Sequence, residues 1–153
     1  MSAFFTRLAV TLVGLPIVLG AAWLGGWVML TLIALAVVVA LHELFRATRH
    51  LRPLTLAGFT GGLVTLLALQ LGGTAWLPLG AGVALVMAFV MAVMADTSQS
   101  NTVAVSVTVF GVLWIALGLG YLVLIREYAL DPGASEPDKG RLAIFTVLLA
   151  VFA

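Results

Sequence analysis

Two long stretches without a charged side chain constrain this chain more than any other feature of its sequence. Residues 8–42 and residues 53–95 contain no Asp, Glu, Lys or Arg. Only 8% of the residues are charged and the mean hydropathy is +1.25, whereas a soluble domain carries about 25% charged residues. A soluble helix needs a polar face, which these stretches lack. The sequence therefore predicts an all-α, polytopic transmembrane protein.

Glycine and polar residues divide the apolar sequence into successive helices. Residues 8–42 would span about 53 Å as one straight helix, far more than the roughly 30 Å hydrocarbon core of a bilayer. Gly25-Gly26 is a natural break, so we expect one helix over 5–24 and another over 27–47. The further elements that we expect are helices over 54–72, 76–95 and 102–125, followed by a solvated polar loop over 126–141.

The last apolar run, residues 142–153, is about 18 Å long as a helix and too short to cross a bilayer. Ending there would leave free carbonyls and a carboxylate near mid-membrane, which is costly. We therefore expect about five full membrane helices plus a truncated sixth, in a fragment of a longer protein; a short interfacial helix is the alternative. The expected organisation is a single membrane-embedded region over 1–153, made of N-terminal helices 1–72, middle helices 76–125, the loop 126–141 and the start of a further helix 142–153.

Composition argues against several classes of protein. The net charge of +1 provides no basic surface for nucleic acid. The absence of cysteine excludes disulfides, thiolate metal sites and a cysteine nucleophile. A secretory signal peptide is the competing interpretation of Arg7–Ala22, but no good small-x-small cleavage site precedes Trp23.

Small residues four positions apart predict where the helices touch. Gly58 and Gly62 form one such pair, and Ala116 and Gly120 form another. Gln70 is the only amide deep in an apolar run, and we expect it to hydrogen-bond to a neighbouring helix.

The charged segment between the two charge-free stretches, Leu41–Pro53 (LHELFRATRHLRP), is called here the basic cluster. Its start resembles the zinc motif H-E-x-x-H, but the second histidine is replaced by Arg46, so no zinc site is expected. Glu43 and Arg46 are i,i+3 neighbours, and we expect them to be coupled on one helix face.

Two interpretations of the basic cluster stay open. It anchors a membrane exit among lipid phosphates, or it receives a phosphate headgroup and organises a cytoplasmic site. The candidate residues are Glu43, Arg46 and Arg49. No catalytic, cofactor-binding or metal-binding residue is predicted.

The arginines also predict orientation. Arg7 precedes the first helix and Arg46, Arg49 and Arg52 follow the second, so a helical hairpin places all four on one side. The positive-inside rule then places the N-terminus in the cytoplasm. The loop 126–141 falls outside, although it carries three basic residues.

Three segments occur in a familiar order. They are Arg7-Leu8 through Val13-Gly14-Leu15-Pro16 to Gly25-Gly26-Trp27; Ala40-Leu41-His42-Glu43-Leu44-Phe45-Arg46; and Phe110-Gly111-Val112-Leu113-Trp114 to Leu122-Val123-Leu124-Ile125-Arg126. Together they resemble the N-terminal part of the phosphatidate cytidylyltransferase (CDP-diacylglycerol synthase) family of bacterial membranes. The second is similar to that family's A-L-x-E-F-x-R segment, with His42 as a departure. The resemblance covers nearly the whole chain.

The resemblance implies an enzyme of the bacterial inner (cytoplasmic) membrane that makes CDP-diacylglycerol and pyrophosphate from phosphatidic acid and CTP. It also implies a divalent metal, Mg, in the parent enzyme. The family signature, D-x-x-A-Y-x-x-G followed by K-x-x-P-x-x-S-P-x-K-T-x-E-G, would begin just after Ala153 and is absent. We therefore transfer no metal or CTP ligand and expect the chain alone to be inactive.

The alternative is a non-enzymatic polytopic protein, either a small transporter or an assembly subunit. A transporter needs polar groups along a path through the membrane, and Gln70 with a few Ser and Thr residues is thin support for one. The sequence leaves the oligomeric state open, a homodimer included.

Overall fold

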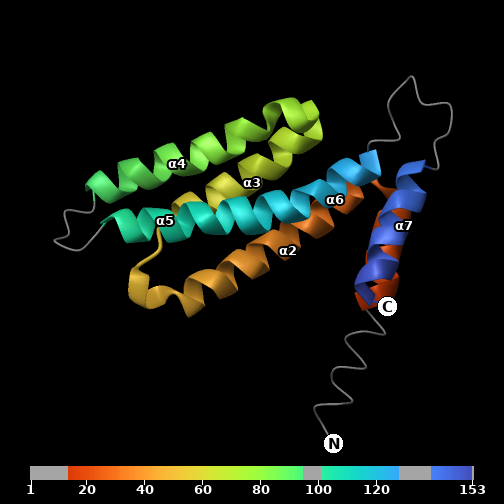
Figure 1. The fold of residues 1–153 in the computed structure, drawn as a ribbon, viewed down its shortest axis with the longest axis horizontal. Coiled ribbons are helices and arrows are strands. Elements are labelled where there is room, and N and C mark those ends of the chain that lie inside the picture. The colour runs from red at the N-terminus through yellow and green to blue at the C-terminus, as the bar shows by residue number, and fades with distance from the viewer. Residues whose placement is uncertain (1–13, 95–100, 128–138, 153) are drawn as a thin grey trace, which may run out of the picture. The chain divides into compact units, whose positions relative to one another are not determined.

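The computed structural model describes residues 14–94, 101–127 and 139–152, and all the regular structure in these ranges is helical (Figure 1). The elements in chain order are a helix over Gly14–Leu24, α2 (Gly26–Ala47), η1 (Arg49–Leu51), α3 (Thr55–Gly72), η2 (Gly73–Trp76), α4 (Leu77–Met94), α5 (Asn101–Gly111), η3 (Val112–Ala116), α6 (Leu117–Glu127) and α7 (Lys139–Phe152). The predicted all-α class is confirmed.

Three stretches are long and apolar enough to cross a membrane: Gly26–Ala47, Thr55–Trp76 and Thr102–Glu127. The last one joins α5, η3 and α6 without a break, and η3 is a turn of π-helix within it. The predicted helices over 27–47, 54–72, 76–95 and 102–125 agree with the structure within two residues at each described end. Residues 5–13 of the first predicted helix lie outside the described residues.

The predicted loop over 126–141 is shorter in the structure. Helix α6 continues through Glu127 and α7 begins at Lys139, so the chain between them is reduced to residues 128–138, which lie outside the described residues. The polar composition of Arg126-Glu127 suggested that the helix ends before them. Their side chains instead bind backbone groups at the turn between the first helix and α2, as described below.

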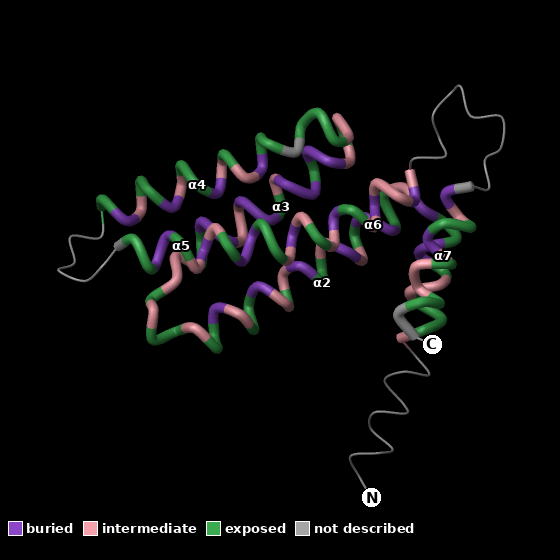
Figure 2. The backbone as a smooth tube through the Cα atoms, in the orientation of Figure 1, coloured by how far each residue is buried: buried purple, intermediate pink, exposed green. Residues whose placement is uncertain are grey.

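The described helices fall into two compact units. Unit 1 comprises residues 1–32 and 125–153, and unit 2 comprises residues 33–124. Within unit 2, α3 contacts α4, α5 and η3, and α4 also contacts α5. Figure 2 shows buried residues on the sides of α3, α4 and α5 that face one another and exposed residues on their outer sides.

Glycines on α3 leave room for side chains of α2. A Cβ atom at Gly62 would lie 2.9 Å from Leu41 Cδ1, and one at Gly58 would collide with the ring of Phe45. On the other predicted pair, a Cβ at Gly120 would collide with Leu69. The small-residue contacts predicted from sequence are therefore confirmed as helix–helix contacts of unit 2.

The prediction for Gln70 is not confirmed. Its Oε1 atom is buried and has no hydrogen-bond partner among the described residues. The expected hydrogen bond from a neighbouring helix to this oxygen is therefore absent from the described part of the chain.

The contact between α3 and α4 gives a matched test. A Cβ at Gly61 would lie 2.9 Å from the backbone Cα of Ala84, whereas one at Gly82 on α4 has no neighbour within 4 Å. Both substitutions to alanine improve helix propensity by about 1 kcal/mol, but only Gly61→Ala overpacks the interface, at about 1–3 kcal/mol. We expect thermal unfolding in detergent to show Gly61→Ala less stable than Gly82→Ala. Equal melting temperatures would contradict this packing.

Candidate functional site

The basic cluster is displayed by the way α2 packs into unit 2. Val37, Leu41 and Phe45 recur at helical spacing and are almost fully buried, at 0%, 0% and 4% exposure. The ring of Phe45 meets that of Phe59 edge to face, with 5.7 Å between centroids. Because this stripe faces the protein, the residues between its members face outward. His42, Glu43 and Arg46 are accordingly exposed.

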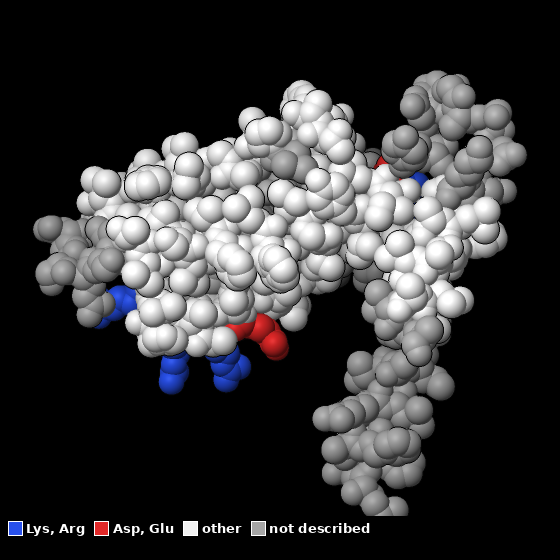
Figure 3. All heavy atoms as spheres, in the orientation of Figure 1, with Lys and Arg blue, Asp and Glu red and all other residues white. Residues whose placement is uncertain are grey.

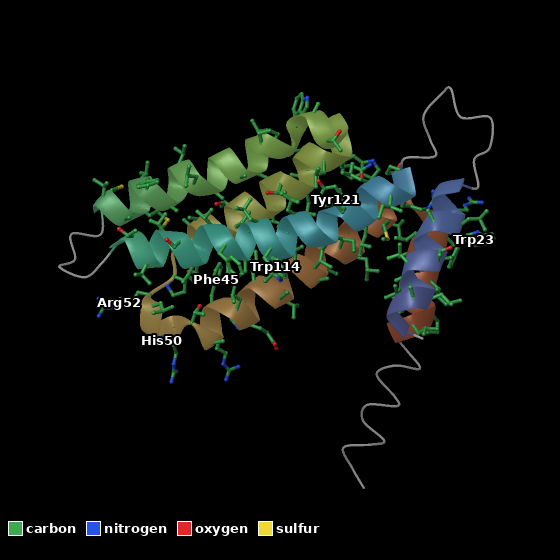
Figure 4. All side chains as sticks on the ribbon, in the orientation of Figure 1. Trp23, Phe45, His50, Arg52, Trp114 and Tyr121 are labelled. Carbon is green, nitrogen blue, oxygen red and sulfur yellow. The ribbon has the colours of Figure 1, made fainter. Side chains whose placement is uncertain are left out.

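A tight turn carries the rest of the basic cluster. The Thr48 hydroxyl donates to the Leu44 carbonyl over 2.7 Å at the end of α2. The Arg52 N–H donates to the Arg49 carbonyl over 3.1 Å and closes η1. Arg49, His50 and Arg52 are all exposed, and Figure 4 shows His50 and Arg52 pointing away from the helices.

Charge gathers along this end of α2 and the turn that follows, as Figure 3 shows on the face it presents. Glu43, Arg46 and Arg49, the residues predicted from sequence, all belong to this exposed group. No ion pair joins Glu43 to Arg46 in the described residues, so their coupling on one helix face stays a prediction. Exposed pairs of this kind are worth about 0–1 kcal/mol even when they form.

Arg52 has a backbone conformation that the sequence did not reveal. Its φ and ψ are 51° and 56°, and it is the only non-glycine residue with positive φ in the described part of the chain. This left-handed region costs an ordinary residue about 1–2 kcal/mol. The conformation lets the chain reverse between η1 and α3, and it places a long cationic side chain where glycine would be easier to accommodate.

The turn is fastened to α5 by a buried hydroxyl. The Leu54 N–H donates to Thr108 Oγ1 over 2.9 Å, and the same hydroxyl donates to the Ala104 carbonyl over 2.8 Å. Thr108 is fully buried. This side chain therefore fixes the start of α3, two residues after Arg52, relative to α5.

The described residues do not provide a metal site. Nowhere in the described ranges do three or more His, Asp or Glu side chains come together. Asp96 lies outside those ranges. The carboxylates and histidines described here do not fit the divalent metal that the sequence resemblance implies.

At the opposite end of α2, sequence reasoning missed a buried charge. Arg126 was expected in a solvated loop, but it is only 4% exposed and its Nε–H donates to the Ala22 carbonyl over 2.7 Å. That interpretation is wrong because the carbonyls at a helix C-terminus lack intrahelical partners and attract a cation. The partners are 104 residues apart in sequence, so no local pattern revealed the contact.

These features define an integral membrane protein of apolar helices with an exposed cationic cluster at one end of α2. Within that class, the chain belongs to the cytidylyltransferase family, because the model of that family matches residues 5–153. The family recognised from sequence is thereby confirmed, and it is a family of nucleotidyltransferases. No curated protein and no solved structure gives a significant match.

The hydrogen bond from the Leu54 N–H to Thr108 Oγ1 can be tested by substitution. Thr108→Val leaves the Leu54 N–H without its acceptor, which costs about 1–3 kcal/mol, whereas Thr108→Ser keeps the hydroxyl. We expect faster hydrogen exchange at the Leu54 amide and a lower melting temperature for Thr108→Val only. Ser106→Ala is the control, because that exposed hydroxyl bonds within its own helix. Unchanged exchange in Thr108→Val would exclude this role.

Proposed function

We propose that the chain forms a membrane-embedded part of a phosphatidate cytidylyltransferase and that the basic cluster receives the lipid phosphate. Membership of the cytidylyltransferase family supports the reaction class. The exposed arginines at the end of an apolar helix are the observation that supports a lipid substrate. Helix α2 thus combines an apolar span with cationic side chains at and after its C-terminal end.

Arginine suits this role chemically. Its planar guanidinium can bind a phosphate through two parallel hydrogen bonds. A basic residue at a membrane surface contributes about 1 kcal/mol to the attraction of anionic lipid. The left-handed backbone of Arg52 adds to the argument, because a strained residue that retains a long functional side chain suggests a role for that side chain.

In the proposed reaction, a phosphate oxygen of phosphatidic acid attacks the α-phosphorus of CTP. The new P–O bond forms as the bond to the β-phosphate breaks, and pyrophosphate leaves with that electron pair. Arg46, Arg49 and Arg52 would hold and orient the lipid phosphate. Divalent metal and CTP ligands are not assigned to the described residues, and no step is routed through them.

The same charges support an orientation in the bacterial inner membrane with the basic cluster and the N-terminus in the cytoplasm, where CTP is available. The three basic residues counted against this orientation are Arg126, Lys139 and Arg141. Arg126 is buried against helix carbonyls, and the Arg141 guanidinium lies 5.0 Å from the ring centroid of Trp23. Two of the three are therefore engaged within the protein, which leaves the basic cluster as the larger free positive charge.

The function is tested by CTP-dependent formation of CDP-diacylglycerol in membranes of a host depleted of its own enzyme. We expect the natural reading frame that encodes the chain to restore product above the background of the host. Failure of the natural reading frame to make product would refute the proposed function. In that case the family's nucleotidyl transfer would have to use a different acceptor.

If the basic cluster binds the lipid phosphate, substitutions of its arginines and of Glu43 should change the KM for phosphatidic acid in opposite directions. Arg49→Gln should raise the KM for phosphatidic acid about fivefold, equivalent to about 1 kcal/mol, without changing the KM for CTP. Glu43→Gln removes a repelling charge and should lower the KM for phosphatidic acid. Kinetics in mixed micelles measure both, with Ser106→Ala as the neutral control. Equal effects of Arg49→Gln on both substrates would rule out a lipid-specific role.

A further inference from the structure

In unit 1, several hydrogen bonds hold the turn between the helix Gly14–Leu24 and α2. The Ala21 carbonyl accepts from the Gly25 N–H over 2.8 Å. The next two carbonyls, of Ala22 and Trp23, accept from Arg126 Nε and Nη2 over 2.7 and 3.1 Å. One guanidinium thus binds two adjacent carbonyls that the helix Gly14–Leu24 cannot satisfy itself. Its positive charge also faces the negative end of that helix.

The next residue in sequence performs the reciprocal task for α2. Glu127 Oε1 accepts from the Gly26 N–H over 2.7 Å, at the first residue of α2. A carboxylate at a helix N-terminus satisfies an unpaired N–H and opposes the positive end of the helix dipole. Arg126 and Glu127 therefore cap the end of one helix and the start of the next from a distant segment.

The turn itself is shaped to admit the guanidinium. Gly25 and Gly26 both have positive φ, at +65° and +54°. A Cβ at Gly25 would lie 2.8 Å from Arg126 Cζ, whereas a Cβ at Gly26 has no neighbour within 4 Å. Gly25 therefore has two reasons to be glycine, its backbone conformation and the room that Arg126 needs. Gly26 has only the first.

The capped turn also touches α7 through Trp23. The Trp23 carbonyl accepts a hydrogen bond from Arg126. The Trp23 ring lies 6.2 Å from the Phe145 ring, centroid to centroid, and the Arg141 guanidinium lies over the same Trp23 ring. Ile144, beside Phe145, is fully buried. The Trp23 side chain therefore links the turn to α7.

We propose that Arg126 and Glu127 are positioning residues that form a cap in trans, fix the turn between the first helix and α2, and through Trp23 set the position of α7. Neither residue is assigned a part in binding lipid or nucleotide. The inference is independent of the proposed function, since it concerns how unit 1 is held together.

The position of α7 can be measured by cross-linking, because the chain has no cysteine of its own. Leu19 and Leu148 line the same groove between the first helix and α7, so Leu19→Cys with Leu148→Cys should cross-link with a short bis-maleimide in membranes. Adding Arg126→Gln should reduce the rate of cross-linking about tenfold, as expected for loss of hydrogen bonds from a buried charged group. Arg126→Lys should lose less, and Glu127→Gln, which keeps an acceptor, should lose less than Glu127→Ala.

The two glycines provide the matched control. Gly25→Ala and Gly26→Ala carry a similar penalty for positive φ, but only Gly25→Ala displaces Arg126. We expect Gly25→Ala to slow cross-linking severalfold more than Gly26→Ala, and this difference to vanish when Arg126→Gln is also present.

Rapid cross-linking in Arg126→Gln would overturn the proposal, as would equal behaviour of the two glycine variants. If Arg126→Gln does not accumulate in membranes, the glycine pair decides alone. Loss of cross-linking in Gly25→Ala with retention in Gly26→Ala supports the cap, and any other pattern rejects it. Cytidylyltransfer is not a readout here, so failure of the proposed function leaves this test intact.

Discussion

The turn between the helix Gly14–Leu24 and α2 depends on the hydrogen bonds of the buried Arg126 side chain. Removing a guanidinium from water costs several kcal/mol unless hydrogen bonds replace its hydration. The carbonyls of Ala22 and Trp23 provide that replacement, and they carry the partial negative charge of a helix C-terminus. The same bonds complete a helix end that would otherwise expose unpaired backbone groups. Each partner therefore satisfies a requirement of the other, and Glu127 completes the arrangement on α2.

Helix α2 consequently has very different ends. At its start, Gly26 is capped by a carboxylate from a distant segment. The helix is 22 residues, or about 33 Å, long, and the arginines at and after its C-terminal end are exposed. That length matches the roughly 30 Å hydrocarbon core of a bilayer. One end of the helix uses charge to hold the protein together, and the other presents charge to its surroundings. This asymmetry is why the lipid-phosphate proposal rests on the basic cluster and not on Arg126.

The sequence predicted the features that depend on local pattern. The lengths of the charge-free stretches predicted the helices, and Gly25-Gly26 predicted the turn between the first two. The small-residue pairs predicted the helix contacts of Gly58, Gly62 and Gly120. Local pattern could not give the partners of Arg126 or Glu127, which lie more than 100 residues away. The bond between Leu54 and Thr108 joins residues 54 apart and was missed for the same reason.

The candidate site was predicted in part. Exposure of Glu43, Arg46 and Arg49 follows from helical spacing against the buried stripe of α2, so their common location could be foreseen. The left-handed backbone of Arg52 could not, because Arg52 precedes Pro53 and such residues usually adopt extended conformations. The absence of an ion pair between Glu43 and Arg46 in the described residues was also not foreseen, since helical spacing permits a pair without requiring it.

The proposed orientation rests on the exposed charge of the basic cluster, because Arg126 and Arg141 are engaged within the protein. The most direct test is labelling of single cysteines in intact cells by an impermeant thiol reagent, against the cysteine-free background of the chain. We expect Ser135→Cys to react from outside and Thr48→Cys to react only after permeabilisation. Labelling of Thr48→Cys in intact cells, with Ser135→Cys silent, would contradict the proposed orientation.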